Sequence, residues 1–381
     1  MITHLECGHC RARHRADELQ TTCTACAGPL LARYEVGPAM PSLEDVLNRP
    51  AGQFRFHEML PVDSGASTKT LGEGATPLIP VPGLDPRVLV KDEAQNPTGS
   101  FKARGMAVAV ARNAELGADH LCLPSNGNAG GAAAAYGALH EVDVEVAVPA
   151  NTPQPLVDEV VAYGAGITLV EGSIADAASV MTRRAAENGW FSMATLGEPY
   201  RVEGKKMMGY EVFWDLGHLP DVIIYPTGGG TGLVGMVKAF DEMEALGWIG
   251  SERPRMVAAQ IEGCAPIVSA FHDGRDDAAP WRDPVETAAF GLRVPSALGD
   301  RLMLDGLRRT NGTAVAVAEA TLIEATKRLA SSTGILGSPE VGVCVGAFDE
   351  LDRAGWIGPD DEVVIFNTGA ASKYGPSPHR C

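Results

Sequence analysis

One lysine in this sequence lies where its side-chain amine could do covalent chemistry. Lys102 follows a turn-forming run, NPTG at 96–99, and precedes residues 106–111, which can be helical. An apolar strand is expected before the turn, at 87–90. A lysine held between a strand and a helix start can form an imine with an aldehyde cofactor, because its amine is positioned and close to a helix N-terminus. A surface lysine that caps a turn is the alternative, and two further loops argue against it.

The second loop, PSNGNAGG at 124–131, lies between an apolar run and an alanine-rich segment. Short polar residues at a helix N-terminus present backbone N–H groups together with Ser and Asn side chains. Such a group of donors, aided by the helix dipole, suits a carboxylate. The alternative is an ordinary N-cap, where Ser and Asn are common for local reasons.

The third loop, PTGGGTG at 226–232, follows the apolar run at 222–225 and precedes an expected helix. Its glycines allow successive N–H groups to converge on an oxyanion such as a phosphate. The loop lacks the Lys-Ser/Thr end of a nucleotide-triphosphate loop and the GxGxxG spacing of a dinucleotide site. A phosphate on a small cofactor therefore fits better than a nucleotide, and a plain flexible turn is the alternative.

Together, a reactive lysine, a carboxylate site and a monophosphate site describe a pyridoxal phosphate enzyme that acts on an amino acid. The aldehyde would attach to Lys102, and the phosphate would bind the loop at 228–232. The strand that ends near 367 would bring the hydroxyl of Thr368 to the pyridine nitrogen. A neutral group there would leave that nitrogen largely unprotonated, which suits elimination and replacement chemistry.

A separate chemical feature lies at the N-terminus, where two CxxC pairs are separated by twelve residues. Each pair can aim two thiolates at one point, so that two pairs complete a tetrahedral zinc site of structural type. A redox CxxC pair and two disulfides are the competing interpretations, and disulfides are rare in a reducing compartment. His9 and His14 are possible alternative ligands. The four expected ligands are Cys7, Cys10, Cys23 and Cys26.

The elements that must position these residues alternate between strand and helix. Short apolar runs, typical of strands, are separated by longer segments whose apolar residues have helical spacing. This alternation predicts βαβ units and parallel sheets buried on both faces. In such sheets, ligands bind on the loops that follow the carboxyl ends of strands. The expected strands, besides the one at 87–90, are 120–124, 142–148, 166–170, 221–225, 255–259 and 362–366, and the expected helices include 128–139, 153–163, 173–187, 232–246 and 315–331.

Composition limits the class of protein. The 381 residues carry a net charge of −17, which argues against a nucleic-acid or anionic-membrane partner. The sequence contains no run of about 18 or more apolar residues, so no membrane span is predicted. No secretory signal is recognised, and a cytoplasmic location is expected. The predicted organisation is a zinc-ribbon-like segment at 1–36, a large cofactor-binding domain at 37–117 and 206–381, and a small α/β domain at 118–205.

Three stretches resemble the threonine synthase family, within the tryptophan synthase β-like superfamily of fold type II. They are LGEGATPL at 71–78, NPTGSFK at 96–102, and EPYRVEGKK at 198–206, which is similar to the family pattern N-P-x-R-x-E-G-x-K. The similarity covers about 70 to 370. It implies a two-domain fold type II enzyme with parallel-rich open sheets, which is commonly a homodimer, and a cysteine-rich N-terminal extension also occurs in that family.

The resemblance implies a role for individual residues. Lys102 would be the Schiff-base lysine and proton shuttle, with Phe101 beside the cofactor. Cationic or N–H donors must bind a leaving phosphate, and the candidates are Thr98, Arg104, Arg201 and Lys205. The remaining implied contacts are Asn128 to the ring hydroxyl of the cofactor, Ser125, Asn126 and Ala129 to the substrate carboxylate, Thr368 to the ring nitrogen, and Gly228, Gly229, Gly230, Thr231 and Gly232 to the cofactor phosphate.

The sequence departs from the family pattern at two positions. Ala103 replaces the usual Asp, and Glu198 replaces the usual Asn. SFKxRG is also a pattern of serine/threonine ammonia-lyases and racemases. The expected reaction is conversion of O-phospho-L-homoserine and water to L-threonine and phosphate. The alternatives are β-elimination or β-replacement on serine, threonine or a related amino acid, as in an ammonia-lyase or a cysteate synthase, and a non-catalytic protein of the same fold. Lys205 and Lys206 could also be a solvated helix face paired with Glu203.

Overall fold

The computed structural model describes residues 2–37, 40–62, 69–282 and 286–374. Contacts divide the chain into two compact units. The first unit comprises Met1–Ala75 and Asn96–Met207, and the second comprises Thr76–Gln95 and Met208–Cys381. The sequence grouped residues 96–117 with the larger domain, whereas contacts group them with the first unit, because helix α2 (Lys102–Glu115) packs against α3 (Asn128–His140).

The first unit contains two sheets. An antiparallel ribbon has the strand order β2-β1-β3, and a parallel sheet has the order β8-β7-β6-β9. In the parallel sheet, α5 (Ile174–Asn188) packs against β6 and β7, and α3 packs against β7 and α4 (Gln154–Ala162). The strands of these sheets are β1 (Ile2–Cys7), β2 (Arg13–His14), β3 (Leu30–Tyr34), β6 (His120–Pro124), β7 (Asp143–Pro149), β8 (Gly166–Val170) and β9 (Phe191–Ser192).

The helix α5 shows how local sequence sets the bounds of an element in this unit. Ser173 and Asp176 form a reciprocal capping box at its start, which satisfies N–H groups that the first turn leaves unpaired. Gly189 ends the helix with φ 72°, a left-handed conformation that glycine adopts without steric cost. The unit also contains α1 (Leu43–Leu47), η1 (Gln53–Met59) and η4 (Pro97–Gly99).

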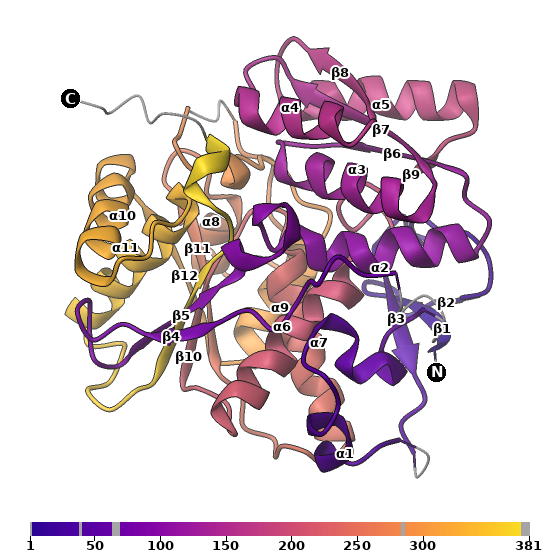
Figure 1. The fold of residues 1–381 in the computed structure, drawn as a ribbon. Coiled ribbons are helices and arrows are strands. Elements are labelled where there is room, and N and C mark those ends of the chain that lie inside the picture. The colour runs from indigo at the N-terminus through magenta and orange to yellow at the C-terminus, as the bar shows by residue number, and fades with distance from the viewer. Residues whose placement is uncertain (1, 38–39, 63–68, 283–285, 375–381) are drawn as a thin grey trace. The chain divides into compact units, whose positions relative to one another are not determined.

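The second unit is built on one six-stranded sheet of order β12-β11-β10-β13-β5-β4. Only β4 is antiparallel to its neighbour; the other pairs are parallel. Figure 1 shows α10 and α11 on one side of this sheet and α7 and α9 on the other. Coverage on both faces explains why strands such as VIIYP in β10 are buried at every position. The strands are β4 (Leu78–Pro80), β5 (Val88–Asp92), β10 (Val222–Pro226), β11 (Arg255–Ile261), β12 (Thr313–Val317) and β13 (Val363–Asn367).

The helices of the second unit follow its strands in sequence. Helix α6 (Arg201–Leu216) contains the boundary between the two units, at Met207 and Met208. The others are α7 (Thr231–Ala245), α8 (Pro266–His272), α9 (Asp300–Arg309), α10 (Glu319–Thr333) and α11 (Pro339–Arg353), with short turns η3 (Glu93–Gln95), η5 (Phe290–Leu292) and η6 (Ala371–Tyr374).

The predicted α/β fold is confirmed, and one predicted element is wrong in part. The helix expected at 315–331 begins only at Glu319, because the alternating residues of TAVAV form strand β12 in parallel with β11. The segment at 271–293 contains the end of α8 and the short turn η5, and its residues 283–285 lie outside the described ones. Residues 38–39, which follow the ribbon, also lie outside them.

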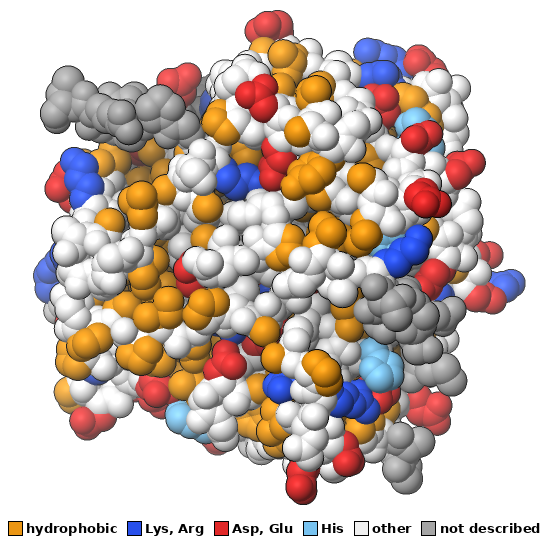
Figure 2. Space-filling view, in the orientation of Figure 1, with side chains coloured by type: hydrophobic (Ala, Val, Ile, Leu, Met, Phe, Trp, Pro, Cys, Tyr) orange, Lys and Arg blue, Asp and Glu red, His pale blue; other side chains and the backbone are white. Residues whose placement is uncertain are grey.

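Two global properties accompany this fold. None of the helices in the described ranges is long and apolar enough to cross a membrane. On the face drawn in Figure 2, acidic and basic side chains are interspersed with apolar and neutral ones.

Candidate active site

The lysine loop of the first unit is a strained turn that ends at the start of a helix. Thr98 has φ 59°, a left-handed conformation that is unfavourable for a β-branched residue, and Gly99 follows with φ 61°. Asn96 holds the turn, since its side-chain oxygen accepts from Gly74 N at 3.0 Å and its carbonyl accepts from Gly99 N at 2.9 Å. Lys102 is the first residue of α2. The turn-then-helix position predicted for Lys102 is therefore confirmed.

Two glycines allow α2 and the start of α6 to touch backbone to backbone. A Cβ on Gly204 would overlap the carbonyl oxygen of Arg104, and one on Gly105 would lie 2.8 Å from the carbonyl oxygen of Arg201. Gln53 links the two helices where they cross, because its Nε2 donates to the carbonyl of Arg104 on α2 at 2.9 Å and to that of Gly204 on α6 at 2.8 Å. This close approach brings the side chains of α6 to the lysine loop.

Two lysines consequently flank one aromatic ring. The Nζ atom of Lys102 lies 4.2 Å from the ring centroid of Phe101, and the Nζ atom of Lys205 lies 4.9 Å from it. Lys205 is fully buried. Burial lowers the pKa of Lys205 well below its ordinary value, the charges of Lys102 and Arg201 lower that pKa further, and Glu198 opposes them. The structure thus brings together four of the predicted site residues, Phe101, Lys102, Arg201 and Lys205.

The two arginines predicted to bind a leaving phosphate are both buried and already hold protein partners. Arg201 donates from Nη1 to the Met193 carbonyl at 2.7 Å, and its Nε has no hydrogen-bond partner among the described residues. Burial lowers the pKa of Arg201, against the charge of Glu198. Arg104 donates from Nη1 to Gln53 Oε1 at 3.1 Å. Of the two arginines, Arg201 therefore has a donor, its Nε–H, that could bind an anion.

Glu198, one of the two departures from the family pattern, caps a helix. Its Oε2 accepts from Tyr200 N at 2.8 Å and its Oε1 from Arg201 N at 2.7 Å, at the start of α6. Burial raises the pKa of Glu198, and Arg201 and these two N–H donors oppose the rise. The carboxylate is therefore directed into the backbone of its own helix, which is a favourable place for an acidic group.

The predicted carboxylate loop leads into α3. Ser125 Oγ accepts from Gly127 N and from Gly130 N, both at 2.9 Å, so its remaining hydrogen can be donated to a ligand. Gly127, the residue before the helix that begins at Asn128, has φ 116° and no side chain of its own to cap that helix, and the Ser125 hydroxyl binds the first-turn N–H of Gly130 instead. Asn126 and Ala129 lie in the same loop.

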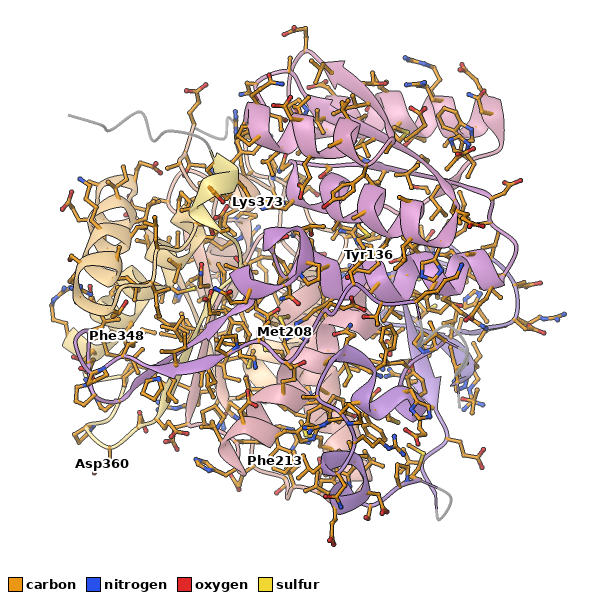
Figure 3. All side chains as sticks on the ribbon, in the orientation of Figure 1. Tyr136, Met208, Phe213, Phe348, Asp360 and Lys373 are labelled. Atoms are coloured by element: carbon orange, nitrogen blue, oxygen red, sulfur yellow. The ribbon has the colours of Figure 1, made fainter. Side chains whose placement is uncertain are left out.

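The helix α3 that follows this loop is anchored by a tyrosine. Tyr136 (Figure 3) donates from its hydroxyl to Glu73 Oε2 at 2.6 Å, within the LGEG stretch. Burial raises the pKa of Tyr136, and Glu73 adds to the rise. The hydroxyl therefore keeps its proton and its bond, which fixes the LGEG segment on α3.

The glycine loop of the second unit has no room for side chains. A Cβ on Gly232 would overlap the hydroxyl of Tyr225, one on Gly230 would overlap Met303, and one on Gly228 would lie 2.9 Å from the Gly291 carbonyl oxygen. Gly230 also has φ 80°. Helix α7 begins at Thr231, and its N-cap residue, Gly230, has no side chain to cap it. The backbone N–H groups of a 15-residue helix thus face a loop that only glycine can form.

Thr368 follows directly on β13 in the second unit and is nearly buried. Beside it, Asn367 donates from Nδ2 to Asp92 Oδ1 at 2.7 Å. Asn367 Oδ1 and the buried Ser338 Oγ have no hydrogen-bond partner among the described residues. Buried polar atoms without partners are costly unless a ligand satisfies them.

These features test whether the residues fit a pyridoxal phosphate group. In the second unit, the glycine loop at the start of α7 suits its phosphate and the unsatisfied polar atoms near Thr368 suit a heteroaromatic ring. In the first unit, Lys102 suits its aldehyde. Each unit taken by itself therefore has residues that fit a part of the group. The predicted cofactor residues belong to both units, with Lys102, Phe101 and Asn128 in the first and the glycine loop and Thr368 in the second.

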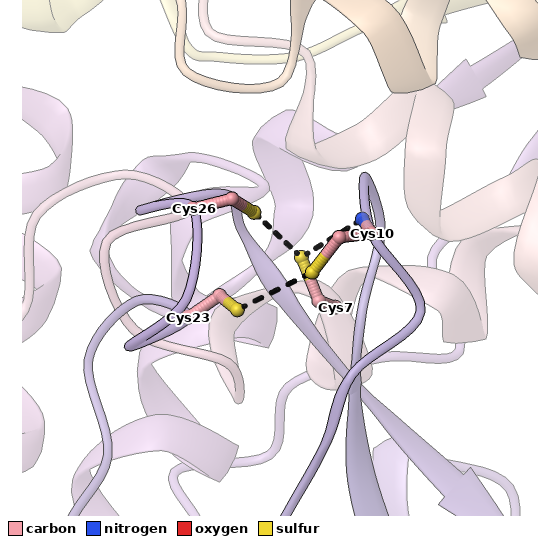
Figure 4. A group of neighbouring side chains, drawn as sticks. All are labelled: Cys7, Cys10, Cys23 and Cys26. Atoms are coloured by element: carbon pink, nitrogen blue, oxygen red, sulfur yellow. Dashed lines mark hydrogen bonds between the residues drawn. The ribbon is translucent and has the colours of Figure 1, made fainter.

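The four N-terminal cysteines gather in the ribbon (Figure 4). Their sulfur atoms all lie within 4.8 Å of one another, with Cys7 and Cys26 at 3.5 Å and Cys10 and Cys23 at 3.6 Å. A tetrahedral zinc–thiolate site has sulfurs about 3.8 Å apart, given a Zn–S bond of about 2.3 Å. Burial alone would raise the pKa of Cys7, but N–H donors from Cys10 and His9 lower it to about 7. The seven cysteines of the described ranges are all free.

The ribbon is tied to α6 by a buried group that sequence reasoning missed. Tyr34, at the end of β3, donates to Glu203 Oε2 at 2.7 Å, and Lys206 Nζ lies 2.8 Å from the same oxygen. Lys206 Nζ also lies 4.0 Å from the Tyr34 ring centroid. Glu203, Lys205 and Lys206 are fully buried, so the solvated helix face considered for them is wrong. Neither Tyr34 nor Gln53 lies in a motif that points to this role.

Comparison with known proteins agrees with this geometry. A family described as "Pyridoxal-phosphate dependent enzyme" matches residues 69–369. Threonine synthase of Methanosarcina acetivorans is 32% identical over 373 residues, which are 96% of this chain and 91% of that protein. Threonine synthase of Methanocaldococcus jannaschii is 32% identical over 376 residues, with 96% and 92% covered.

The chain therefore belongs to the family of pyridoxal-phosphate dependent enzymes. Among solved structures, a maize serine racemase shares the fold, with a TM-score of 0.67 at 21% identity and coverage of 78% of this chain and 88% of that one. A fungal L-serine ammonia-lyase from Rhizomucor miehei also shares it, with a TM-score of 0.65 at 20% identity and coverage of 79% and 97%. Within the family, the similarity over nearly the whole chain groups this protein with the threonine synthases.

Proposed function

We propose that this enzyme converts O-phospho-L-homoserine and water to L-threonine and phosphate. The observation that carries the proposal is the 32% identity to threonine synthases over 96% of the chain. The lysine at the start of α2 and the glycine loop before α7 support the proposal, because they would supply the reactive amine and the phosphate site that this chemistry needs.

When bound, pyridoxal phosphate withdraws electrons from the α-carbon of an attached amino acid. Lys102 would hold the aldehyde, 228–232 the phosphate, Asn128 the ring hydroxyl and Thr368 the ring nitrogen. Lys102 begins a helix beside the ring of Phe101, and its amine would take the α-proton and move protons at the β-carbon.

The chain's own donors would orient the substrate. The Ser125 hydroxyl, which accepts two N–H groups and keeps its own hydrogen, would donate to the substrate carboxylate, and the backbone at the start of α3, near Asn126 and Ala129, would add the partial positive charge of a helix N-terminus. Arg201 has a buried Nε available for an anion. Arg201, Lys205, Arg104 and Thr98 are the proposed donors to the leaving phosphate.

A second part of the proposal concerns the ribbon. The four cysteines would bind a zinc ion, since their sulfur separations suit a tetrahedral thiolate site without an open position. His14 Nε2 lies 3.3 Å from Cys23 Sγ, where it can donate to the thiolate instead of replacing it. Such an ion would support structure and take no part in the chemistry. A homodimer and a cytoplasmic location stay predictions from the sequence.

The deciding experiment measures phosphate release from O-phospho-L-homoserine by the cofactor-loaded enzyme. Phosphate and threonine should appear in equal amounts, and Lys102→Ala should abolish both together with the absorbance band of the attached cofactor. No turnover by an enzyme that shows this band would reject the substrate.

The second candidate, an ammonia-lyase acting on unphosphorylated threonine or serine, is favoured by one observation, Ala103 in place of the usual Asp beside Lys102. A 2-oxo acid formed from threonine, without phosphate release from the phosphorylated substrate, would establish it instead.

A further inference from the structure

The ribbon of the first unit touches the start of helix α6 through one stripe of side chains. Tyr200, directly before α6, and Glu203 and Lys206 within it are spaced three residues apart and are fully buried. Tyr34 of strand β3 donates to Glu203 Oε2 at 2.7 Å, and its ring centroid lies 4.0 Å from Lys206 Nζ. The Tyr200 hydroxyl lies 3.5 Å from the carbonyl oxygen of Ala16, between β2 and β3. The ribbon thus contacts one side of the helix, because residues three apart are neighbours on a helix surface.

The two cations proposed to bind the leaving phosphate lie on the opposite side of α6. Arg201 and Lys205 are four residues apart and share a second stripe of the helix. Because a helix turns by about 100° per residue, this stripe lies about half a turn away from Glu203. The Nζ atom of Lys205 lies 4.9 Å from the ring centroid of Phe101, in the lysine loop. The ribbon therefore supports α6 from the side away from the lysine loop.

The ribbon also holds α2, the helix that begins with the proposed cofactor lysine. Arg112, near the end of α2, donates from Nη2 to the Ala16 carbonyl at 2.8 Å, and its guanidinium carbon lies 5.9 Å from the ring centroid of Tyr200. One carbonyl of the ribbon thus links α2 to the segment that leads into α6. The two helices touch backbone to backbone at Gly105 and Gly204, so a movement of either helix changes how their side chains meet.

We propose that Tyr34 is a positioning residue for the site, because its bond to Glu203 fixes the orientation of α6 that directs Arg201 and Lys205 toward the leaving phosphate. The inference rests on the proposed function, in which these two cations bind that phosphate. Removal of the Tyr34 hydroxyl takes a donor away from the buried carboxylate of Glu203, which is costly away from water. The first turns of α6 should move to regain a donor, and Arg201 and Lys205 should move with them.

The test compares Tyr34→Phe with the unmodified protein, both loaded with cofactor and well below the temperature of unfolding. The phosphate group of O-phospho-L-homoserine is present before and during bond cleavage, so the loss of donors that hold it should act mainly on KM. The KM for this substrate and the dissociation constant of inorganic phosphate, from calorimetry, should both rise roughly 2- to 30-fold, with kcat changed less. A purely structural role would reduce only the amount of active enzyme, which lowers the apparent kcat at an unchanged KM.

Two further variants complete the comparison. Arg33→Met is the matched control, because Arg33 precedes Tyr34 on β3 and pairs with Glu6 inside the ribbon at 2.8 Å. It removes a contact within the ribbon and leaves the docking contacts in place, so KM and phosphate affinity should stay unchanged. Arg112→Met removes the other link to the ribbon and should act in the same direction as Tyr34→Phe. It decides the question if Tyr34→Phe does not fold.

Three results would overturn the inference: a folded Tyr34→Phe protein with unchanged KM and phosphate affinity, a fall in kcat alone, or equal changes in Arg33→Met. The proposed function would fail by a different result, the absence of phosphate release from O-phospho-L-homoserine by the unmodified protein. The affinities of the same variants for inorganic phosphate would then still decide whether Tyr34 positions the two cations.

Discussion

The substitution Gly232→Ala adds one methyl group and should weaken cofactor binding. The size of the loss depends on how tightly the residues around Gly232 are packed. The Cβ of Gly232→Ala would overlap the hydroxyl of Tyr225. That tyrosine is 2% exposed, and its ring lies edge-on to Phe366 with centroids 5.3 Å apart. Because Tyr225 is rigid and enclosed, the loop and the first turn of α7 must move instead. These are the N–H groups proposed to bind the cofactor phosphate.

The magnitude follows from the usual cost of overpacking. Forcing a methyl group into a well-packed site costs about 1–3 kcal/mol. If cofactor binding restores the original loop, this energy is subtracted from binding, and the dissociation constant rises by about 5- to 150-fold. Gly228→Ala should have a smaller effect, because its Cβ would lie 2.9 Å from the Gly291 carbonyl oxygen, which is less close than the overlap that a Cβ on Gly232 would have with the Tyr225 hydroxyl.

The assay is equilibrium binding of pyridoxal phosphate, followed by absorbance, with thermal unfolding measured in parallel. Gly250→Ala is the matched control, since a Cβ there has open space within 4 Å and its backbone needs no left-handed conformation. Affinity should fall in the order Gly250→Ala, Gly228→Ala, Gly232→Ala. A Gly232→Ala enzyme that binds the cofactor as tightly as the control would refute the assignment of this loop to the phosphate.

Three further predictions concern the first unit. Tyr34→Phe removes a hydrogen bond to the buried carboxylate of Glu203, so unfolding of this unit should become easier by about 1.5–3 kcal/mol, measured by thermal unfolding; an unchanged midpoint would contradict the docking of the ribbon. A zinc chelator should lower the unfolding temperature of the intact protein, whereas a double variant, Cys7→Ser with Cys23→Ser, should contain no zinc by elemental analysis and be indifferent to the chelator. The last prediction concerns pH. Burial raises the pKa of Glu198, so the folded state binds a proton on this carboxyl more tightly than the unfolded state does. The stability that this tighter proton binding contributes is full below the unfolded pKa and is lost as pH rises through the folded pKa. The stability of the natural protein relative to Glu198→Gln, from denaturation at several pH values, should therefore fall as pH rises above about 4.3, and a rise would reverse the sign of the argument.

Local signals in the sequence sufficed for the elements that flank the site. Strands β6 and β8 have the predicted bounds, and α3 begins at Asn128 as expected, because apolar runs and turn residues act over a few positions. The prediction assigned part of strand β12 to the following helix, because over a few residues the sequence VAVAEA fits the two-residue period of a strand and the 3.6-residue period of a helix equally well. The four cysteines come together as their spacing indicated.

Burial of charge was the main thing that the sequence could not reveal. Glu203, Lys205 and Lys206 have the composition of an exposed helix face, yet all are fully buried, because the segments that cover and satisfy this face are distant in sequence. Tyr34 is one such partner of Glu203, and Gln53, which bonds the carbonyl of Gly204, is 151 residues away from it. Pairing over such separations leaves no local pattern to read.

The docking of the ribbon also bears on the order in which the chain folds during synthesis. Tyr34 and its acceptor Glu203 are 169 residues apart. The other anchor of the ribbon, the carbonyl of Ala16, receives Arg112 Nη2 at 2.8 Å. At about 5–20 residues per second, Glu203 is made roughly 8–34 s after Tyr34. The ribbon is therefore synthesised well before its docking site, and the proposed metal ion on its four cysteines would let it fold with nothing from the rest of the chain.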